Sequence, residues 1–109
     1  VLPNDPMIAD TLGWIMYRQG QYTWALALLQ ESAARLPDHA EIQYHLGMAQ
    51  YMTGAEAAAR SSLVKALQLA ADFPGRADAV QHLEVLSIDA TTPAATARAA
   101  LEKALSTQP

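Results

Sequence analysis

The sequence predicts an all-α protein built from helical hairpins that repeat about every 34 residues. Residues 12–25 return 34 positions later as residues 46–59, and a period of this length is typical of stacked helical units. Apolar residues recur at three- and four-residue steps, which is the spacing of one helix face. Hydrophobic residues make up 51% of the chain, and no run of β-branched residues suggests a sheet.

The glycines and alanines shared by the two copies stand where the helices must pack closely or end. A glycine inside a helix costs about 1 kcal/mol relative to alanine, so a glycine at the middle of both first helices predicts a second helix pressed against that backbone. A glycine at the end of each first helix suits the positive φ of a helix C-terminus, and a matched alanine lets the partner helix approach. We therefore assign structural roles to Gly13, Gly20, Ala25, Gly47, Gly54 and Ala59.

The first unit is predicted to begin with Asp5 as the N-cap and Pro6 as the first helical residue. This first helix ends at Gly20, and the second covers about residues 22–36 before Pro37. Because the turn between them is so short, the two helices are expected to be antiparallel. The residues expected to be buried are Ile8, Leu12, Ile15 and Met16 in the first helix and Ala25, Leu26, Leu29, Ala33 and Leu36 in the second.

The second unit starts with Asp38 and Glu41, which have the spacing of a capping box. Its first helix is expected to end at Gly54 and its second to cover about residues 55–71, until the sequence DFPG at 72–75 breaks it. The third unit is atypical. Ala77, Val80, Leu83 and Leu86 indicate a fifth helix, residues 87–93 replace the short glycine turn, and a sixth helix begins near Pro93. The expected units are residues 4–37, 38–73 and 74–109, in one segment over 1–109 that we interpret as a piece of a longer array.

These residues resemble the tetratricopeptide repeat (TPR), a helix-turn-helix unit of 34 residues. The signature positions hold Leu12, Gly13, Gly20, Tyr22, Ala25, Leu29 and Pro37 in the first unit and Leu46, Gly47, Gly54, Ala59, Leu63 and Ala66 in the second. The early tryptophan of the pattern is replaced by Ala9 and Gln43. The phrases DTLGWIMYRQGQY and YHLGMAQ are also similar to bacterial TPR proteins that accompany exopolysaccharide and PEP-CTERM (exosortase) systems.

The TPR resemblance implies a right-handed superhelix whose first helices line a concave groove for a partner peptide or helix. Helical spacing places aromatic, methionine and polar residues on the groove side, and such side chains suit an apolar or amphipathic partner. The expected groove residues are Asp10, Trp14, Tyr17, Arg18, Glu41, Tyr44, His45, Met48, Tyr51, Met52 and His82. The alternative is that some of these side chains pack between neighbouring units. The groove lacks the lysine, arginine and asparagine of TPRs that clamp a chaperone's C-terminal carboxylate, so we expect no binding of such tails.

Composition excludes several other functions. Eleven acids and seven bases are scattered along the chain, with a net charge of −4, which leaves no basic stripe for nucleic acid. No apolar run is long enough to cross a membrane, and no signal peptide is visible, so the compartment could be cytoplasmic or periplasmic. Cysteine is absent. His39, His45 and His82 are the only candidate metal ligands besides carboxylates, and we expect neither a metal nor a cofactor.

We expect no enzymatic activity in this segment, because neither a strained nucleophile turn nor a glycine-rich phosphate loop occurs. Asp10 and Glu41 could be imagined as an acid–base pair, but a polar rim suits them better. The remaining alternatives to a binding module are a structural spacer, an oligomerisation segment or a regulatory region of a larger enzyme. Trp24 is expected to face solvent on the second helix, so a homodimer could form through it or through exposed repeat ends.

Overall fold

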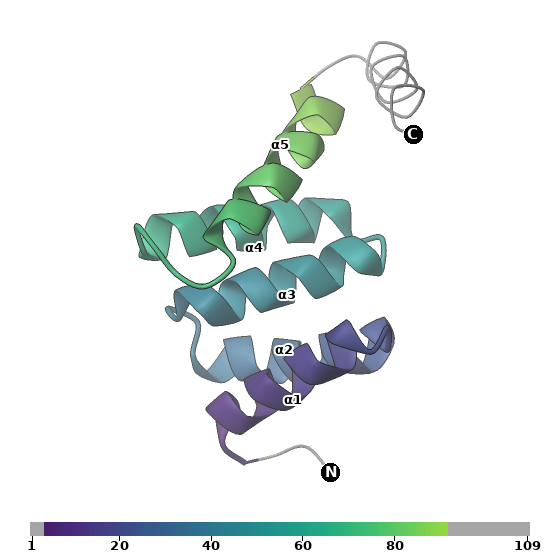
Figure 1. Cartoon of the computed structure of the whole chain (residues 1–109), viewed down its shortest axis with the longest axis vertical. Coiled ribbons are helices and arrows are strands. Elements are labelled where there is room, and N and C mark those ends of the chain that lie inside the picture. Colours follow the sequence, from purple (N-terminus) through teal and green to yellow (C-terminus); the bar gives the residue numbers. More distant parts are fainter. Residues whose placement is uncertain (1–3, 92–109) are drawn as a thin grey trace.

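The computed structural model describes residues 4–91, which form five α-helices and no strand. The helices are α1 (Pro6–Arg18), α2 (Tyr22–Arg35), α3 (Ala40–Met52), α4 (Glu56–Leu69) and α5 (Arg76–Thr91). Each helix packs against the next one in the chain, α1 also contacts α3, and α3 also contacts α5 (Figure 1). The predicted all-α, TPR-like hairpin architecture is therefore confirmed. The sense of the superhelix stays a prediction.

The mid-helix glycines lie where two helices of a hairpin approach most closely. A Cβ atom added to Gly13 would lie 2.9 Å from Cγ of Leu29, and one added to Gly47 would lie 2.8 Å from Cδ2 of Leu63. Both leucines are fully buried. The predicted close approach of α2 to α1, and of α4 to α3, is thus confirmed at the atomic level.

Both hairpin turns have the same hydrogen-bonded geometry. Gly20 has φ +83° and Gly54 has φ +88°, the left-handed conformation that favours glycine. In the first turn the amide of Gly20 donates to the carbonyl of Tyr17 and the amide of Gln21 donates to the carbonyl of Met16. This pair of bonds is the Schellman motif, and the amides of Gly54 and Ala55 repeat it. The predicted role of the two glycines at the helix C-termini is confirmed.

In the described part of the chain the core forms two apolar clusters that follow each other along the stack. One lies where α2 meets α3 and contains Ala25, Leu29, Ala33, Ile42, Leu46 and Ala49. The other joins α3, α4 and α5 and contains Tyr44, Met48, Ala59, Leu63, Ala66, Ala79 and Leu86. Because every cluster is shared between neighbouring elements, each hairpin depends on the next to bury its apolar surface.

The helix starts confirm one prediction and correct another. Asp5 is the N-cap of α1, and its carboxylate accepts a hydrogen bond of 2.8 Å from the amide of Met7. The capping box of Asp38 and Glu41 is wrong, because α3 begins at Ala40 and its N-cap is His39. His39 lies 34 residues after Asp5, so the repeat period, and not the local capping pattern, gives the correct start.

The buried stripe predicted for α1 is largely wrong. Ile8, Leu12 and Ile15 are exposed, and Met16 is half-buried. The buried apolar positions of α1 are the small residues Ala9 and Gly13, and Gly13 faces Leu28 and Leu29 of α2. In this hairpin Ile8, Leu12 and Ile15 therefore lie away from the buried side of α1, whereas Met16 packs against the cluster that includes Ala25 and Leu29 of α2.

The third unit also differs from the prediction in two respects. The helix α5 continues to Thr91 instead of ending before residue 87, because no glycine or proline interrupts residues 87–91 and the first such residue is Pro93. Ala77 is exposed, whereas Ala79 and Leu86 are buried. The reason is that Ala79 and Leu86 lie on the face of α5 that packs against Ala59, Leu63 and Ala66 of α4. The predicted sixth helix lies outside the described residues.

Candidate functional site

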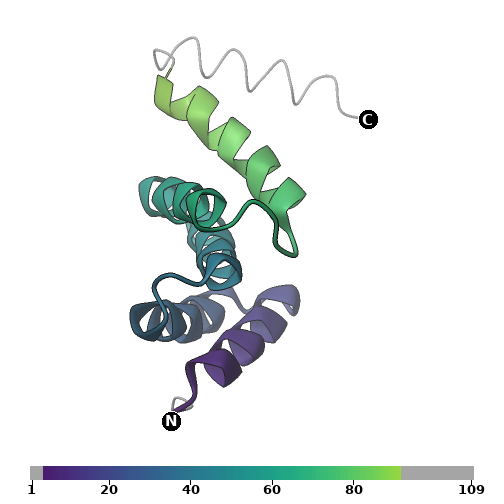
Figure 2. The same cartoon turned by 90° about the vertical axis from the view of Figure 1, so that its left-hand side faces the viewer.

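The helices α1, α3 and α5 carry the predicted groove residues, and the start of α5 lies on the same side of the stack as α1 (Figure 2). The structure brings many of these side chains into one contact network, which we call the inner row. Its members are Asp10, Trp14, Tyr17, Tyr44, His45, Tyr51, Asp78 and His82.

At the α1–α3 end of the inner row, the imidazole of His45 is the central group. Its Nδ1 lies 2.7 Å from Oδ1 of Asp10, and both side chains are buried. Because a carboxylate only accepts, Nδ1 carries the proton in this bond. The ring of Trp14 stacks on His45 with a centroid distance of 4.1 Å, and a carboxylate oxygen of Glu41 lies 3.9 Å from its Nε2. Asp10 and Glu41 thus bracket His45 and do not form a pair with each other.

Between α3 and α5, the phenol of Tyr44 links the second unit to the third. Its hydroxyl donates to Oδ2 of Asp78 at 2.8 Å, and its ring packs on Phe73 and against Gly75. Burial, and after it the hydrogen bond to Asp78, raises the pKa of Tyr44 well above its ordinary value. The other carboxylate oxygen of Asp78 lies 3.2 Å from Nδ1 of His82.

Two further ring contacts extend the inner row. Tyr17 stacks on Trp14 at 4.5 Å, and Tyr51 meets His82 edge-on at 5.1 Å. Burial, and after it the negative charge of Asp78, raises the pKa of Tyr17. The carboxylate of Asp78 therefore acts electrostatically on the phenol of Tyr17, and 42% of the Asp78 side chain is exposed.

The predicted groove residues fall into three groups by burial. Those that face other side chains are buried: Asp10, Tyr44, His45 and Met48. Those that are partly accessible are Trp14, Tyr17, Glu41, Tyr51 and His82, and those that are exposed are Arg18 and Met52. The packing alternative thus describes the first group, whereas binding of a partner by the others stays a prediction. Asp78 stands 34 residues after Tyr44, and the helical spacing that places His82 on the groove side also extends the row to Asp78.

Two helical pairs of an acid and a histidine occur at a spacing of four residues, Glu41 with His45 and Asp78 with His82. Over residues 4–91, however, no group of three or more possible ligands gathers into a metal site. Within the same residues, none of the helices combines the length and the apolar character that crossing a membrane requires. Trp24 is exposed on α2, as predicted.

The fold and the inner row define a stack of TPR-like helical hairpins. No protein-family model matches the chain. A stretch of 45 residues, 41% of the chain, is 49% identical to a TPR repeat-containing protein of Pseudomonas aeruginosa. The match spans 8% of the length of that protein, so this chain corresponds to a small part of it. The similarity supports the TPR resemblance, while the link to PEP-CTERM systems stays a prediction.

Proposed function

We propose that the chain is a protein–protein interaction module that binds a partner segment along the accessible part of the inner row. The TPR similarity supports a protein partner. The accessible part of the inner row consists of Tyr17, Tyr51, Asp78 and His82, because Trp14 is stacked between Tyr17 and His45 and the other members are buried. The exposed side chain of Met52, next to Tyr51 in α3, adds to this surface. This surface is smaller than the groove expected from the sequence.

The observation that carries the proposal is the partly exposed carboxylate of Asp78 among aromatic rings. Tyr44 donates one hydrogen bond to it. Nδ1 of His82 lies 3.2 Å from its other oxygen and bonds the backbone carbonyl of Asp78 at 2.8 Å, so the carboxylate can accept further hydrogen bonds. A lysine or arginine of the partner would gain from the charge and from the neighbouring faces of Tyr17 and Tyr51. An apolar side chain next to it would contact Met52. We therefore propose a partner segment with a basic residue beside an apolar one.

The test is selection of peptides from a phage-displayed random library on the folded chain, followed by calorimetric titration of the enriched peptides. We expect enriched peptides to carry a lysine or arginine beside an apolar residue. Asp78→Asn should weaken their binding at least about tenfold, as the loss of a charged contact does, while the amide oxygen still accepts from Tyr44. The matched control is Asp72→Asn, the same charge change at an exposed loop residue, which should leave affinity unchanged.

Two results would contradict the proposal. Equal loss of affinity in Asp78→Asn and Asp72→Asn would show a non-specific charge effect. A failure to enrich any peptide, with both variants folded by circular dichroism, would favour the structural spacer. A role as a regulatory region of a larger enzyme is a separate hypothesis.

A further inference from the structure

The imidazole of His82 lies beside the carboxylate of Asp78, one helical turn further along α5. Its Nδ1 lies 2.8 Å from the backbone carbonyl oxygen of Asp78 and 3.2 Å from Oδ1 of the same residue. Because a carbonyl oxygen only accepts, Nδ1 carries a proton in this bond. In the neutral ring Nε2 therefore carries none, and a second proton taken up there makes the ring a cation next to Asp78.

Of the two histidines in the inner row, His82 is the one that is open to solvent. Its side chain is 27% exposed, whereas that of His45 is 6% exposed. The ring of His45 is bonded to Asp10 and stacked on Trp14. Imidazole is the side chain whose charge ordinarily changes between about pH 5 and 8, where carboxylates and lysines stay charged. A change of pH in this range therefore acts on the inner row through His82.

The other groups around this pair are phenols. From α3, Tyr51 meets the ring of His82 edge-on at 5.1 Å, and Tyr44 donates to Oδ2 of Asp78. From α1, Tyr17 lies within the electrostatic reach of Asp78, since burial and after it this charge raise the pKa of Tyr17. A phenol is ordinarily uncharged between pH 5 and 8. A charge on His82 therefore acts mainly on the carboxylate of Asp78.

The cations of the chain leave this carboxylate to His82. Within residues 4–91, neither a lysine nor an arginine forms an ion pair with Asp78. The cation that α4 directs at α5 is Arg60, and it donates to the backbone carbonyl of Leu86 at 3.3 Å. A protonated His82 is thus the counter-ion that the described part of the chain offers to Asp78.

We propose that His82 is an internal counter-ion of Asp78 that weakens the binding of a basic partner residue when the imidazole is protonated. This inference rests on the proposed function, because it concerns the same carboxylate. A cation 3.2 Å from Oδ1 offsets the negative charge that a lysine or arginine of the partner would bind, and it repels that residue. Affinity should therefore fall as the pH falls. By linkage, a bound partner should in turn displace a proton from His82.

The test is calorimetric titration of an enriched peptide from the phage selection at about pH 7.5 and about pH 5.5. The peptide is acetylated, amidated and free of histidine, so it does not titrate in this range. We expect its Kd to rise about two- to fivefold at the lower pH, which is the usual effect of an exposed ion pair. Titrations near pH 6.5 in two buffers of different ionisation enthalpy should show that protons are released on binding.

Two variants assign the effect to His82. His82→Gln cannot be protonated in this range, so whatever its affinity at the higher pH, its Kd should not change on acidification and proton release should disappear. The matched control is His39→Asn, which removes an imidazole at the N-cap of α3, outside the inner row. Asparagine is a good N-cap, so this variant should keep both the change in Kd and the proton release.

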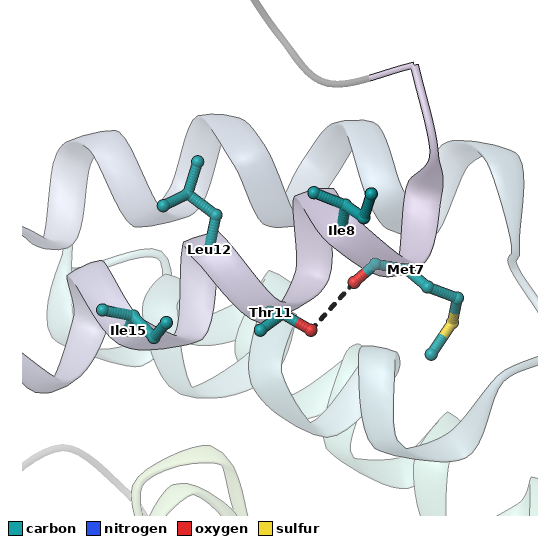
Figure 3. A pocket seen from close by; sticks show the side chains of 5 residues that line it. All are labelled: Met7, Ile8, Thr11, Leu12 and Ile15. Carbon is teal, nitrogen blue, oxygen red and sulfur yellow. Dashed lines mark hydrogen bonds between the residues drawn. The ribbon is translucent and has the colours of Figure 1, made fainter.

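The pH dependence also distinguishes the inner row from another surface that could take an apolar peptide. The outer face of α1 has an open depression, and the residues that line it have no titratable group (Figure 3): Met7, Ile8, Thr11, Leu12 and Ile15. A peptide bound there would have the same Kd at both pH values.

A second readout needs no partner. In the chain alone, the carbon-13 resonance of the Asp78 carboxylate should shift together with the ring resonances of His82 between about pH 8 and 5, and this step should be absent in His82→Gln. The inference is overturned if the carboxylate resonance does not follow the ring. It is also overturned if the peptide binds with the same Kd at both pH values, or if the change in Kd survives His82→Gln. Failure of every peptide to bind would instead overturn the proposed function, and the regulation of binding with it.

Discussion

Replacement of Gly47 by alanine sets two effects of known sign against each other. Alanine favours the helix by about 1 kcal/mol relative to glycine. The added Cβ would lie 2.8 Å and 2.9 Å from Cδ2 and Cγ of Leu63 and 3.3 Å from Cβ of Ser62. Leu63 is fully buried, so it has little room to move, and over-packing of this kind costs about 1–3 kcal/mol. We therefore expect Gly47→Ala to lower the free energy of unfolding by about 0–2 kcal/mol.

A double-mutant cycle with Leu63→Ala isolates the packing effect. Leu63→Ala alone should lower the free energy of unfolding by about 2–5 kcal/mol. A domain of ordinary stability stays folded after such a loss, and sucrose, which stabilises folded proteins, can be added to all four chains if the double variant unfolds. With the leucine side chain removed, Gly47→Ala should become stabilising by about 1 kcal/mol. Urea denaturation monitored by circular dichroism measures all four chains.

The control for this cycle is Gly54→Ala. Gly54 has φ +88° and no atom within 4 Å of an added Cβ, so its substitution should cost about 1–2 kcal/mol through the backbone alone, with or without Leu63. The reasoning is refuted if Gly47→Ala stabilises the unmodified chain by the full helix preference, or if its effect is the same in both backgrounds.

Three further predictions concern single side chains. Asp5→Ala should lower the free energy of unfolding by about 1 kcal/mol through loss of the N-cap, as measured by urea denaturation, and an unchanged value would contradict the cap. Asp10→Ala should cost about 1–3 kcal/mol because it leaves the buried Nδ1 of His45 without an acceptor, whereas Asp10→Asn should cost less in the same assay. The pKa of Tyr44 is raised in the folded chain, so the folded chain keeps the phenol proton at a pH near 10, where the unfolded chain releases it. The contribution of Tyr44 to the free energy of unfolding should therefore be constant below about pH 10 and fall above it. Tyr44→Phe should remove part of that fall between pH 8 and 11, and an equal slope in both chains would refute the assignment to Tyr44.

The inner row shows why the predicted groove was broader than the accessible surface. Helical spacing correctly places Asp10, Trp14 and His45 on facing sides of α1 and α3. Spacing within one helix, however, gives no information on the distance between two helices. In the structure this distance is short enough for Trp14 to stack on His45 and for Asp10 to bind it, so these side chains satisfy one another.

By itself, the sequence determined the hairpins. Few residues other than glycine tolerate the backbone geometry of the turns at Gly20 and Gly54 or the close helix contacts at Gly13 and Gly47. A glycine that recurs at the same position of both repeats was therefore enough to predict each feature. The tertiary structure alone decided which apolar residues are covered. Ile8 and Ile42 occupy the same position of the repeat, yet only Ile42 is buried, because burial depends on whether another helix lies on that face, and no local pattern contains that information.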